Sequence, residues 1–358
     1  MHIALIVDEE RLESEESLYR GICAGLIANG VQLTVVVPEP AGEVLAQEPD
    51  EIERIEIRMK VPLWMRRTRA HQVAGMLESG VPDLLHAMGE DAWKVGLDLA
   101  RVLDRPVTLD LWAAEQVARV PHSRSSKHVA AYVAPTEPIA ELLRQRVDAE
   151  LVSHVPIGVV ATSSVPSVLQ RHDESIGLAI VGTGRDIVAY RAMLTGLSRV
   201  TRELPQIQAC LELRGPYEHE IWRLARRLDL LGHISTIVNA ARHRPLLRGC
   251  DLLIWPERLG VVRSLLLEVM ASGLPVLAAK DPNLDMLIHQ QTAHLVDEPD
   301  SDEWARRLRQ LLGEPEAARR LGASARAWVA TNNRLVDHVS GLQRAFGQVI
   351  SGGAHAFA

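Results

Sequence analysis

The chain has 358 residues, of which 47% are hydrophobic and 24% charged, enough for two soluble domains with separate cores. Its net charge of -7 argues against a nucleic-acid binder, and its three cysteines show no metal-ligand or disulfide spacing. We therefore expect no metal site and a reduced, cytoplasmic compartment. No apolar run approaches the roughly 18 residues of a membrane span, and the opening segment has the pattern of a strand, not of a signal peptide.

Strands and helices alternate along the first half of the sequence. A strand at residues 2–7, a helix near 16–28 and a strand at 31–37 form a βαβ unit, which implies a parallel sheet with helices on its faces. A loop rich in Glu is expected between the first strand and the first helix. Further strands are predicted at 52–58, 84–87 and 107–111, and further helices at 70–79 and 91–103.

Residues 60–69 form a predicted loop that mixes apolar and basic side chains. The segment from Trp64 to Arg69 would suit the surface of an anionic membrane, which would place the protein at the inner face of that membrane. A solvated loop would have the same composition. The sequence leaves both interpretations open.

Residues 161–175 are rich in Ser, Pro and polar side chains, so we predict a linker between two domains there. The second half opens with a strand at 176–181 and a turn at 182–185. This turn lacks the third glycine of a dinucleotide fingerprint, because Ile187 occupies that position. We therefore discount a nicotinamide-dependent oxidoreductase.

The stretch from Trp255 to Pro275 is the most informative for function. A short apolar strand at 251–255 leads into a loop and then a helix at 265–272, for which Ser264 is the predicted N-cap. Unpaired N–H groups and the positive end of the helix dipole make a seat for a phosphate. Glu268 follows one turn later on the face of Ser264, where its carboxylate is placed to accept hydrogen bonds from ribose hydroxyls. An ordinary turn with Glu268 in water is the other interpretation.

The helix in this stretch resembles a known family. Residues 267–276 read Leu-Glu-Val-Met-Ala-Ser-Gly-Leu-Pro-Val, similar to the Leu-Glu-Ala-Met-Ala-Cys-Gly-Leu-Pro-Val segment of glycosyltransferase family 4. The resemblance covers nearly the whole chain. It implies the GT-B fold, an α/β architecture of two Rossmann-like parallel-sheet domains that face each other across a cleft. The implied parts are 1–165 (acceptor side), 166–334 (nucleotide-sugar binding) and a C-terminal helix, 335–358, returning to the first domain.

The same resemblance implies a glycosyltransferase that moves a sugar from a nucleotide-diphosphate sugar to a glycan or lipid-linked acceptor. The reaction would be retaining and metal-independent, with no cofactor besides the donor. Such an enzyme must stabilise a leaving diphosphate and an oxocarbenium-like sugar. The resemblance gives Asp110 a contact with the sugar and Arg185 one with the diphosphate, and these two are the predicted catalytic residues. The predicted donor-binding residues are Gly184, Arg185, Gly215, Arg263, Ser264, Leu265 and Glu268.

Several positions depart from the family pattern. The paired glycines after the first strand fall on Glu13 and Ser14, the sugar-contacting His on Asp110, and the first Glu of the Glu-x7-Glu pair on Gly260. The Lys expected shortly after Arg185 has no local counterpart. Asp110 also fits a plain capping role at a strand end. These departures support a second hypothesis: a catalytically impaired GT-B scaffold that acts as a nucleotide-binding or interaction subunit.

Overall fold

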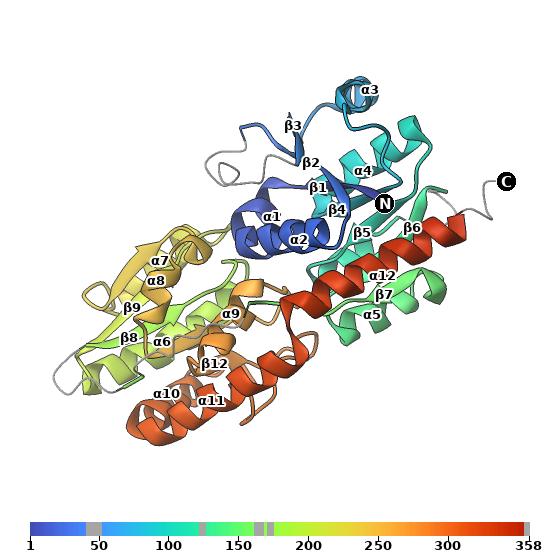
Figure 1. Ribbon diagram of the computed structural model, residues 1–358. Helices are drawn as coiled ribbons and strands as arrows, with labels where there is room; N and C mark the ends of the chain where they lie inside the picture. The colour runs from blue at the N-terminus through green and yellow to red at the C-terminus, as the bar shows by residue number, and fades with distance from the viewer. Residues whose placement is uncertain (41–51, 122–126, 161–167, 170–174, 354–358) are drawn as a thin grey trace. The chain divides into compact units, whose positions relative to one another are not determined.

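The computed structural model describes residues 1–40, 52–121, 127–160, 168–169 and 175–353. The chain divides into two compact units, Met1–Gly158 with Leu335–Ala358 and Val159–Arg334. Each unit contains one parallel sheet, so the predicted α/β class with two parallel-sheet domains is confirmed (Figure 1). Most of the predicted linker at 161–175 lies outside the described residues. Within the described ranges, no helix has the length and apolar character needed to cross a bilayer.

The first unit contains seven parallel strands in the order β3-β2-β1-β4-β5-β6-β7. The central strand β1 is buried at all six residues, which explains its apolar sequence: helices cover both faces of a parallel sheet. The strands are β1 (His2–Val7), β2 (Gln32–Pro38), β3 (Glu53–Ile57), β4 (Leu84–Met88), β5 (Val107–Asp110), β6 (Val129–Ala134) and β7 (Val152–His154).

The helices of the first unit connect these strands, and the last helix of the chain joins them (red in Figure 1). In the described part of this unit, short 3-10 turns lie among them, of which η2 (Leu63–Met65) leads directly into α3. Others are η3 (Ala114–Arg119) and η5 (Ala149–Leu151). The helices are α1 (Glu9–Ser14), α2 (Glu16–Ala28), α3 (Arg66–Met76), α4 (Glu90–Leu103), α5 (Glu137–Arg144) and α12 (Leu335–Gly353).

Two glycines let α12 pack closely on α2. A Cβ at Gly21 would lie 2.6 Å from Leu335, and a Cβ at Gly25 would lie 2.8 Å from Cγ2 of Val339. Both distances are too short for real carbon atoms, so only glycine allows this separation of the helices. Asn29 and Gln343 extend the contact with a side-chain hydrogen bond of 3.0 Å. The C-terminal helix is therefore an integral part of the first unit.

The second unit contains six parallel strands in the order β10-β9-β8-β11-β12-β13. The strands are β8 (Ile176–Ile180), β9 (Ile207–Glu212), β10 (Ile234–Ile237), β11 (Leu252–Trp255), β12 (Val276–Ala279) and β13 (His294–Val296). The helices are α6 (Ile187–Glu203), α7 (Glu218–Arg227), η6 (Ala240–Arg242), α8 (Arg244–Arg248), α9 (Ser264–Ser272), α10 (Ser301–Gly313) and α11 (Pro315–Asn332). Its core lies between the sheet and the apolar faces of α6, α7 and α10.

Two sequence predictions for the first unit were wrong in detail. The Glu-rich segment after β1 is a helix, α1, not a loop, because the Asp8 side chain caps it by accepting the Arg11 N–H at 2.9 Å. The helix predicted from residue 70 begins at Arg66. The Arg66 guanidinium holds the Asp98 carboxylate of α4 with two hydrogen bonds of 2.7 and 2.9 Å, which fixes the first turn of α3.

We expect Gly25→Ala to destabilise the first unit by about 1–2 kcal/mol, because the new methyl group would overlap the buried, β-branched Val339. The matched control is Gly347→Ala in α12, where no atom lies within 4 Å of the added carbon. That change should be neutral or stabilise the helix by up to about 1 kcal/mol. Urea unfolding measures both, and equal midpoints for the two variants would contradict the packing described here.

Candidate functional site

The second unit has its topological switch point beside β8. The chain places β9 and β10 on one side of β8 and β11, β12 and β13 on the other. Ligands of open parallel sheets bind outside the carboxyl ends of the strands where the order reverses. The loops at this point are residues 181–186 after β8 and 256–263 after β11. They include several of the predicted donor-binding residues.

A buried carboxylate joins these two loops. Glu257, which follows β11, accepts hydrogen bonds from the backbone N–H groups of Thr183, of Arg185 at 2.8 Å and of Asp186 at 3.1 Å. Successive N–H groups of this kind form an anion-binding concavity, and here an internal carboxylate fills it. The sequence analysis did not identify Glu257 as a site residue. An acid two residues after a buried strand, beside a Gly-rich turn, is the signal that could have found it.

The predicted residues Gly184 and Gly215 lie next to each other in the structure. Both have positive φ, 65° and 89°, a conformation that favours glycine. A Cβ at Gly184 would overlap the carbonyl oxygen of Arg214, and one at Gly215 would overlap that of Thr183. Close packing of the loops after β8 and β9 therefore accounts for both glycines.

The Arg263 side chain is engaged inside the protein. Its two terminal nitrogens donate to the Glu212 carboxylate at 2.6 and 3.1 Å, and the exposed fractions of the two side chains are 4% and 0%. Glu212 also accepts the backbone N–H of Ala240 at 3.0 Å. This pair ties together the end of β9, the segment after β10 and the start of α9. Removing one partner of such a buried pair typically costs 3–5 kcal/mol.

The predicted helix start is displaced by one residue. Arg263 is the N-cap of α9, with an extended backbone, and Ser264 is already helical. The Ser264 hydroxyl contacts Oε1 of Glu268 at 3.4 Å, so the expected i, i+4 relation is present. Ser264 and Leu265 are both buried. The N-cap of α9 is therefore Arg263, one residue before the Ser264 that the sequence predicts.

Glu268 has a partner that the sequence analysis missed. The Arg244 guanidinium donates to both carboxylate oxygens of Glu268, from Nε at 2.5 Å and from Nη2 at 3.0 Å, and a third nitrogen donates to the Ala241 carbonyl. The pair is partly exposed, with Arg244 at the start of α8. Because these residues are 24 positions apart, no local pattern links them. An arginine at the beginning of a helix after β10 was the only signal available.

Arg185 and Gly260 are two further positions in these loops. The Arg185 side chain is exposed, and its backbone N–H belongs to the set that binds Glu257. Gly260 has a φ of 60°, and its N–H donates to the Asp281 carboxylate at 2.6 Å. This left-handed backbone is unfavourable for a glutamate, which gives a physical reason why the family's Glu is replaced here.

Asp110 lies in the first unit, at the end of β5. Its carboxyl group is buried, and burial raises its pKa well above the usual value, although the nearby Arg11 opposes the shift. Oδ2 lies 3.9 Å from Nε2 of His86, and the backbone carbonyl accepts the Trp93 indole N–H at 3.0 Å. Burial lowers the pKa of His86 to about 3, so the imidazole is neutral. Asp110 is thus a buried residue at the strand end.

The positions of the family's paired glycines lie within α1. Glu13 and Ser14 are helical, and the Ser14 hydroxyl donates to the Glu10 carbonyl at 2.6 Å. At the switch point of this unit, between β1 and β4, the Asp8 carboxylate also accepts the N–H of Asp91 at 3.3 Å. A Cβ at Gly89 would overlap this carboxylate. An internal acid therefore fills this switch point too.

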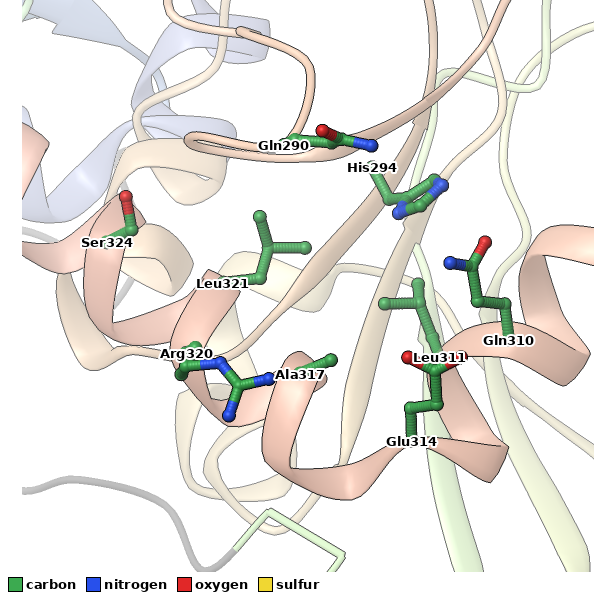
Figure 2. A pocket seen from close by; sticks show the side chains of 9 residues that line it. All are labelled: Gln290, His294, Gln310, Leu311, Glu314, Ala317, Arg320, Leu321 and Ser324. Atoms are coloured by element: carbon green, nitrogen blue, oxygen red, sulfur yellow. The ribbon is translucent and has the colours of Figure 1, made fainter.

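A separate pocket of about 360 Å³ lies on another side of the second unit (Figure 2). His294, the first residue of β13, and Gln290 line it together with side chains of α10 and α11. Burial and the neighbouring Arg307 lower the pKa of His294 to about 4. Because this pocket lies near the amino end of β13, it is not the crevice at the carboxyl ends, and it contains none of the predicted site residues.

Comparison with solved structures identifies the same two-sheet architecture. HepE from Anabaena, in complex with UDP-glucose, has a TM-score of 0.77 and 18% identity, covering 98% of this chain and 100% of that one. Sucrose-phosphate synthase from Thermosynechococcus elongatus has a TM-score of 0.72 and 15% identity, covering 98% and 100%. A putative UDP-N-acetylglucosamine 2-epimerase from Listeria monocytogenes has a TM-score of 0.67 and 13% identity, covering 98% and 97%.

The search of curated proteins finds no match. A family model does match: residues 162–328, most of the second unit, fit the model described as "Glycosyl transferases group 1". This range contains both loops of the switch point and the helix α9 with Glu268. Residues 162–328 are thus similar to the glycosyl transferases group 1, and the two parallel-sheet units have the GT-B fold.

Proposed function

We propose that the protein transfers a sugar from a UDP-sugar to a glycan or lipid-linked acceptor, with retention of configuration and without a metal ion or further cofactor. The observation that carries this proposal is the first turn of α9, where Ser264 and the Arg244-bound Glu268 share one face. The match of residues 162–328 to the glycosyl transferases group 1 supports the transfer reaction. The UDP-glucose complex of HepE supports a uridine nucleotide as the donor.

In this proposal the donor diphosphate lies against the N–H groups of Ser264 and Leu265 and the exposed Arg185 guanidinium. A helix start and a cation stabilise the negative charge that develops on a leaving diphosphate. Gly184 and Gly215, which let the loops after β8 and β9 pack closely together, border the proposed donor site. The sequence predicts that Arg263 binds the donor. We propose instead that Arg263 positions the start of α9, because its guanidinium holds Glu212.

Glu268 would bind the ribose of the donor. Each carboxylate oxygen has two acceptor positions, so the bond from Arg244 leaves capacity for a ribose hydroxyl. The guanidinium also holds the carboxylate in one orientation, which lowers the entropy cost of binding. We infer that Arg244 is a positioning residue for Glu268.

We assign the acceptor side to the first unit and the sugar contact to Asp110. Burial raises the pKa of the Asp110 carboxyl group, and its oxygens can accept hydrogen bonds from sugar hydroxyls. We further propose that the protein works in the cytoplasm at the inner face of a membrane, which it contacts through the segment from Trp64 to Arg69. The high exposure of Trp64 supports that contact.

A catalytically impaired scaffold is the second candidate, and a specific observation favours it. Glu257 occupies three backbone N–H groups at the switch point, where a negatively charged ligand would otherwise find donors. The positive φ of Gly260 and the absence of a lysine shortly after Arg185 also favour the impaired scaffold. Such a protein would act as a nucleotide-binding or interaction subunit and would release no sugar.

The first prediction from this proposal concerns Glu268. UDP is expected to raise the melting temperature of the wild-type protein, since a ligand at one hundred times its Kd adds about 2.7 kcal/mol of stability. Glu268→Gln removes the charged acceptor for ribose and should weaken UDP binding about tenfold or more in calorimetric titration. The matched control is Glu220→Ala on the exposed side of α7, which should leave the Kd unchanged.

A panel of UDP-sugars and acceptors then separates the candidates. Release of UDP with a new glycosidic bond of retained configuration, followed by NMR, is the outcome expected for the enzyme. Tight nucleotide binding without UDP release would favour the scaffold, and conversion of the sugar while still attached to UDP would indicate an epimerase. If no uridine nucleotide changes the melting temperature, the enzyme fails, and only a scaffold that acts as an interaction subunit remains.

The second prediction concerns Glu257. Glu257→Ala leaves three N–H groups without their acceptor, so the melting temperature should fall, by a cost of about 1–3 kcal/mol. Pyrophosphate should restore more stability in this variant than in the wild type. Asp251→Ala is the matched control, because that buried carboxylate also accepts two backbone N–H groups, at 2.7 and 2.8 Å, but at the amino end of β11. Equal pyrophosphate responses in all three proteins would refute an anion site at this loop.

A further inference from the structure

Three large apolar side chains protrude from the first unit at η2. Leu63 is 81% exposed, Trp64 79% and Met65 39%, and they are consecutive. Single exposed apolar residues are common on protein surfaces, but adjacent ones that include a tryptophan usually mark a contact surface. We call Leu63, Trp64 and Met65 the η2 tip.

A pocket of about 560 Å³ adjoins the η2 tip. Its walls are mainly basic, with an apolar contribution from Leu63 of the tip itself. The lining residues are Leu63, Arg66, Arg67, His71, Asp98, Arg101 and Val102. The pocket is thus formed between η2, the first two turns of α3 and the last two turns of α4.

The charges of this pocket do not cancel. Asp98 is its one acidic residue, and it already binds Arg66 at 2.7 Å and Arg101 at 3.1 Å. Within the described ranges, Arg67 and His71 have no acidic side chain at ion-pair distance. Three arginines face one carboxylate, so the pocket is positively charged and suits an anion such as a phosphate group.

Hydrogen bonds from α3 hold the segment next to the η2 tip in place. The buried Arg69 donates to the backbone carbonyls of Arg58, at 3.3 Å, and of Met59, so the segment before the tip is tied to α3. The fork between Arg66 and Asp98 ties α3 to α4 in turn. An apolar tip on such a support enters a binding partner with little loss of conformational entropy.

We propose that the η2 tip and its basic pocket form a docking site for an anionic phospholipid membrane. The side chains of Leu63 and Trp64 would enter the interface between headgroups and acyl chains, and the pocket would bind a lipid phosphate through Arg67. Stable membrane association needs two signals of this kind, one apolar and one electrostatic. An apolar tip beside cations fits a lipid surface better than it fits a protein groove, which would require an apolar border.

This inference rests on the membrane contact proposed above and makes it specific, but it does not depend on sugar transfer. Nucleotide binding involves the second unit, whereas the docking site lies entirely in the first. Vesicle binding without nucleotide therefore tests the docking site alone, and the UDP titration tests the donor site alone.

The experiment is co-sedimentation of the full chain with vesicles of phosphatidylcholine, with and without about one third phosphatidylglycerol. We expect binding to the anionic vesicles that weakens as salt is added. Trp64→Ser should lower the partition coefficient about tenfold or more, since it removes the largest apolar group of the tip. Arg67→Glu should lower it roughly ten- to thirtyfold, because each cation near an anionic surface contributes about fivefold.

Matched controls test place and chemistry separately. Val336→Ser in α12 removes another exposed apolar side chain, 61% exposed, and Arg202→Glu in α6 reverses another exposed charge. Both should bind vesicles like the wild type, and all variants should melt at the same temperature, since the altered side chains are exposed.

Three results would overturn the proposal. One is equal binding, or none, to both kinds of vesicle. Another is anionic binding that neither Trp64→Ser nor Arg67→Glu reduces, including the case of glycerol phosphate binding without vesicle binding. The third is a lipid-free dimer in analytical ultracentrifugation that Trp64→Ser dissociates, because the η2 tip would then contact a second copy of the chain.

Discussion

The buried ion pair between Glu212 and Arg263 is the interaction on which the candidate site depends. Both side chains are almost fully shielded from water, so the free energy lost in dehydrating the charges must be offset by several well-aligned hydrogen bonds. Two come from Arg263 and one from the N–H of Ala240. The pair therefore fixes three chain segments at once: the end of β9, the segment after β10, and the start of α9. The positions of Glu268 and Arg244 depend on this arrangement.

In both sheets, the backbone N–H groups at the switch point find their acceptor in the same way. Backbone N–H groups converge there, and an acid from the protein itself, Asp8 in the first unit and Glu257 in the second, accepts them. The acids stabilise loops that would otherwise need water or a ligand. They also compete with any anionic ligand for the same donors. Sugar transfer in the second unit therefore depends on backbone N–H groups that do not bind Glu257, chiefly those at the start of α9.

The parts of this molecule that follow local patterns were predictable from the sequence. Apolar runs such as that of β1 and the amphipathic helices of both units appear where their periodicity places them, because each element buries a face or a whole strand. The start of α9 was found to within one residue, since strand, loop and helix signals are consecutive there. Helix α1 was missed because Asp, the residue type that caps it at position 8, is also common in turns and loops.

The contacts that decide the chemistry of the site were not predictable in this way. The Arg244–Glu268 pair spans 24 residues, the Arg263–Glu212 pair 51, and the bond from Thr183 to Glu257 spans 74. Each depends on which strand ends the fold brings together, and no local periodicity encodes that information. From the sequence, Arg263 is a suitable phosphate ligand. In the fold its charge is already neutralised by a residue on another strand.

The close packing of α12 on Gly21 and Gly25 has a consequence for biosynthesis. Helix α2 is synthesised before the second unit, whereas its partner α12 leaves the ribosome only after the whole second unit has been synthesised. Until then one face of α2 is exposed to solvent, and the nascent first sheet lacks part of its cover. The second unit, whose sequence is continuous, can complete its core earlier. Folding order in the cell would therefore run opposite to the order of synthesis.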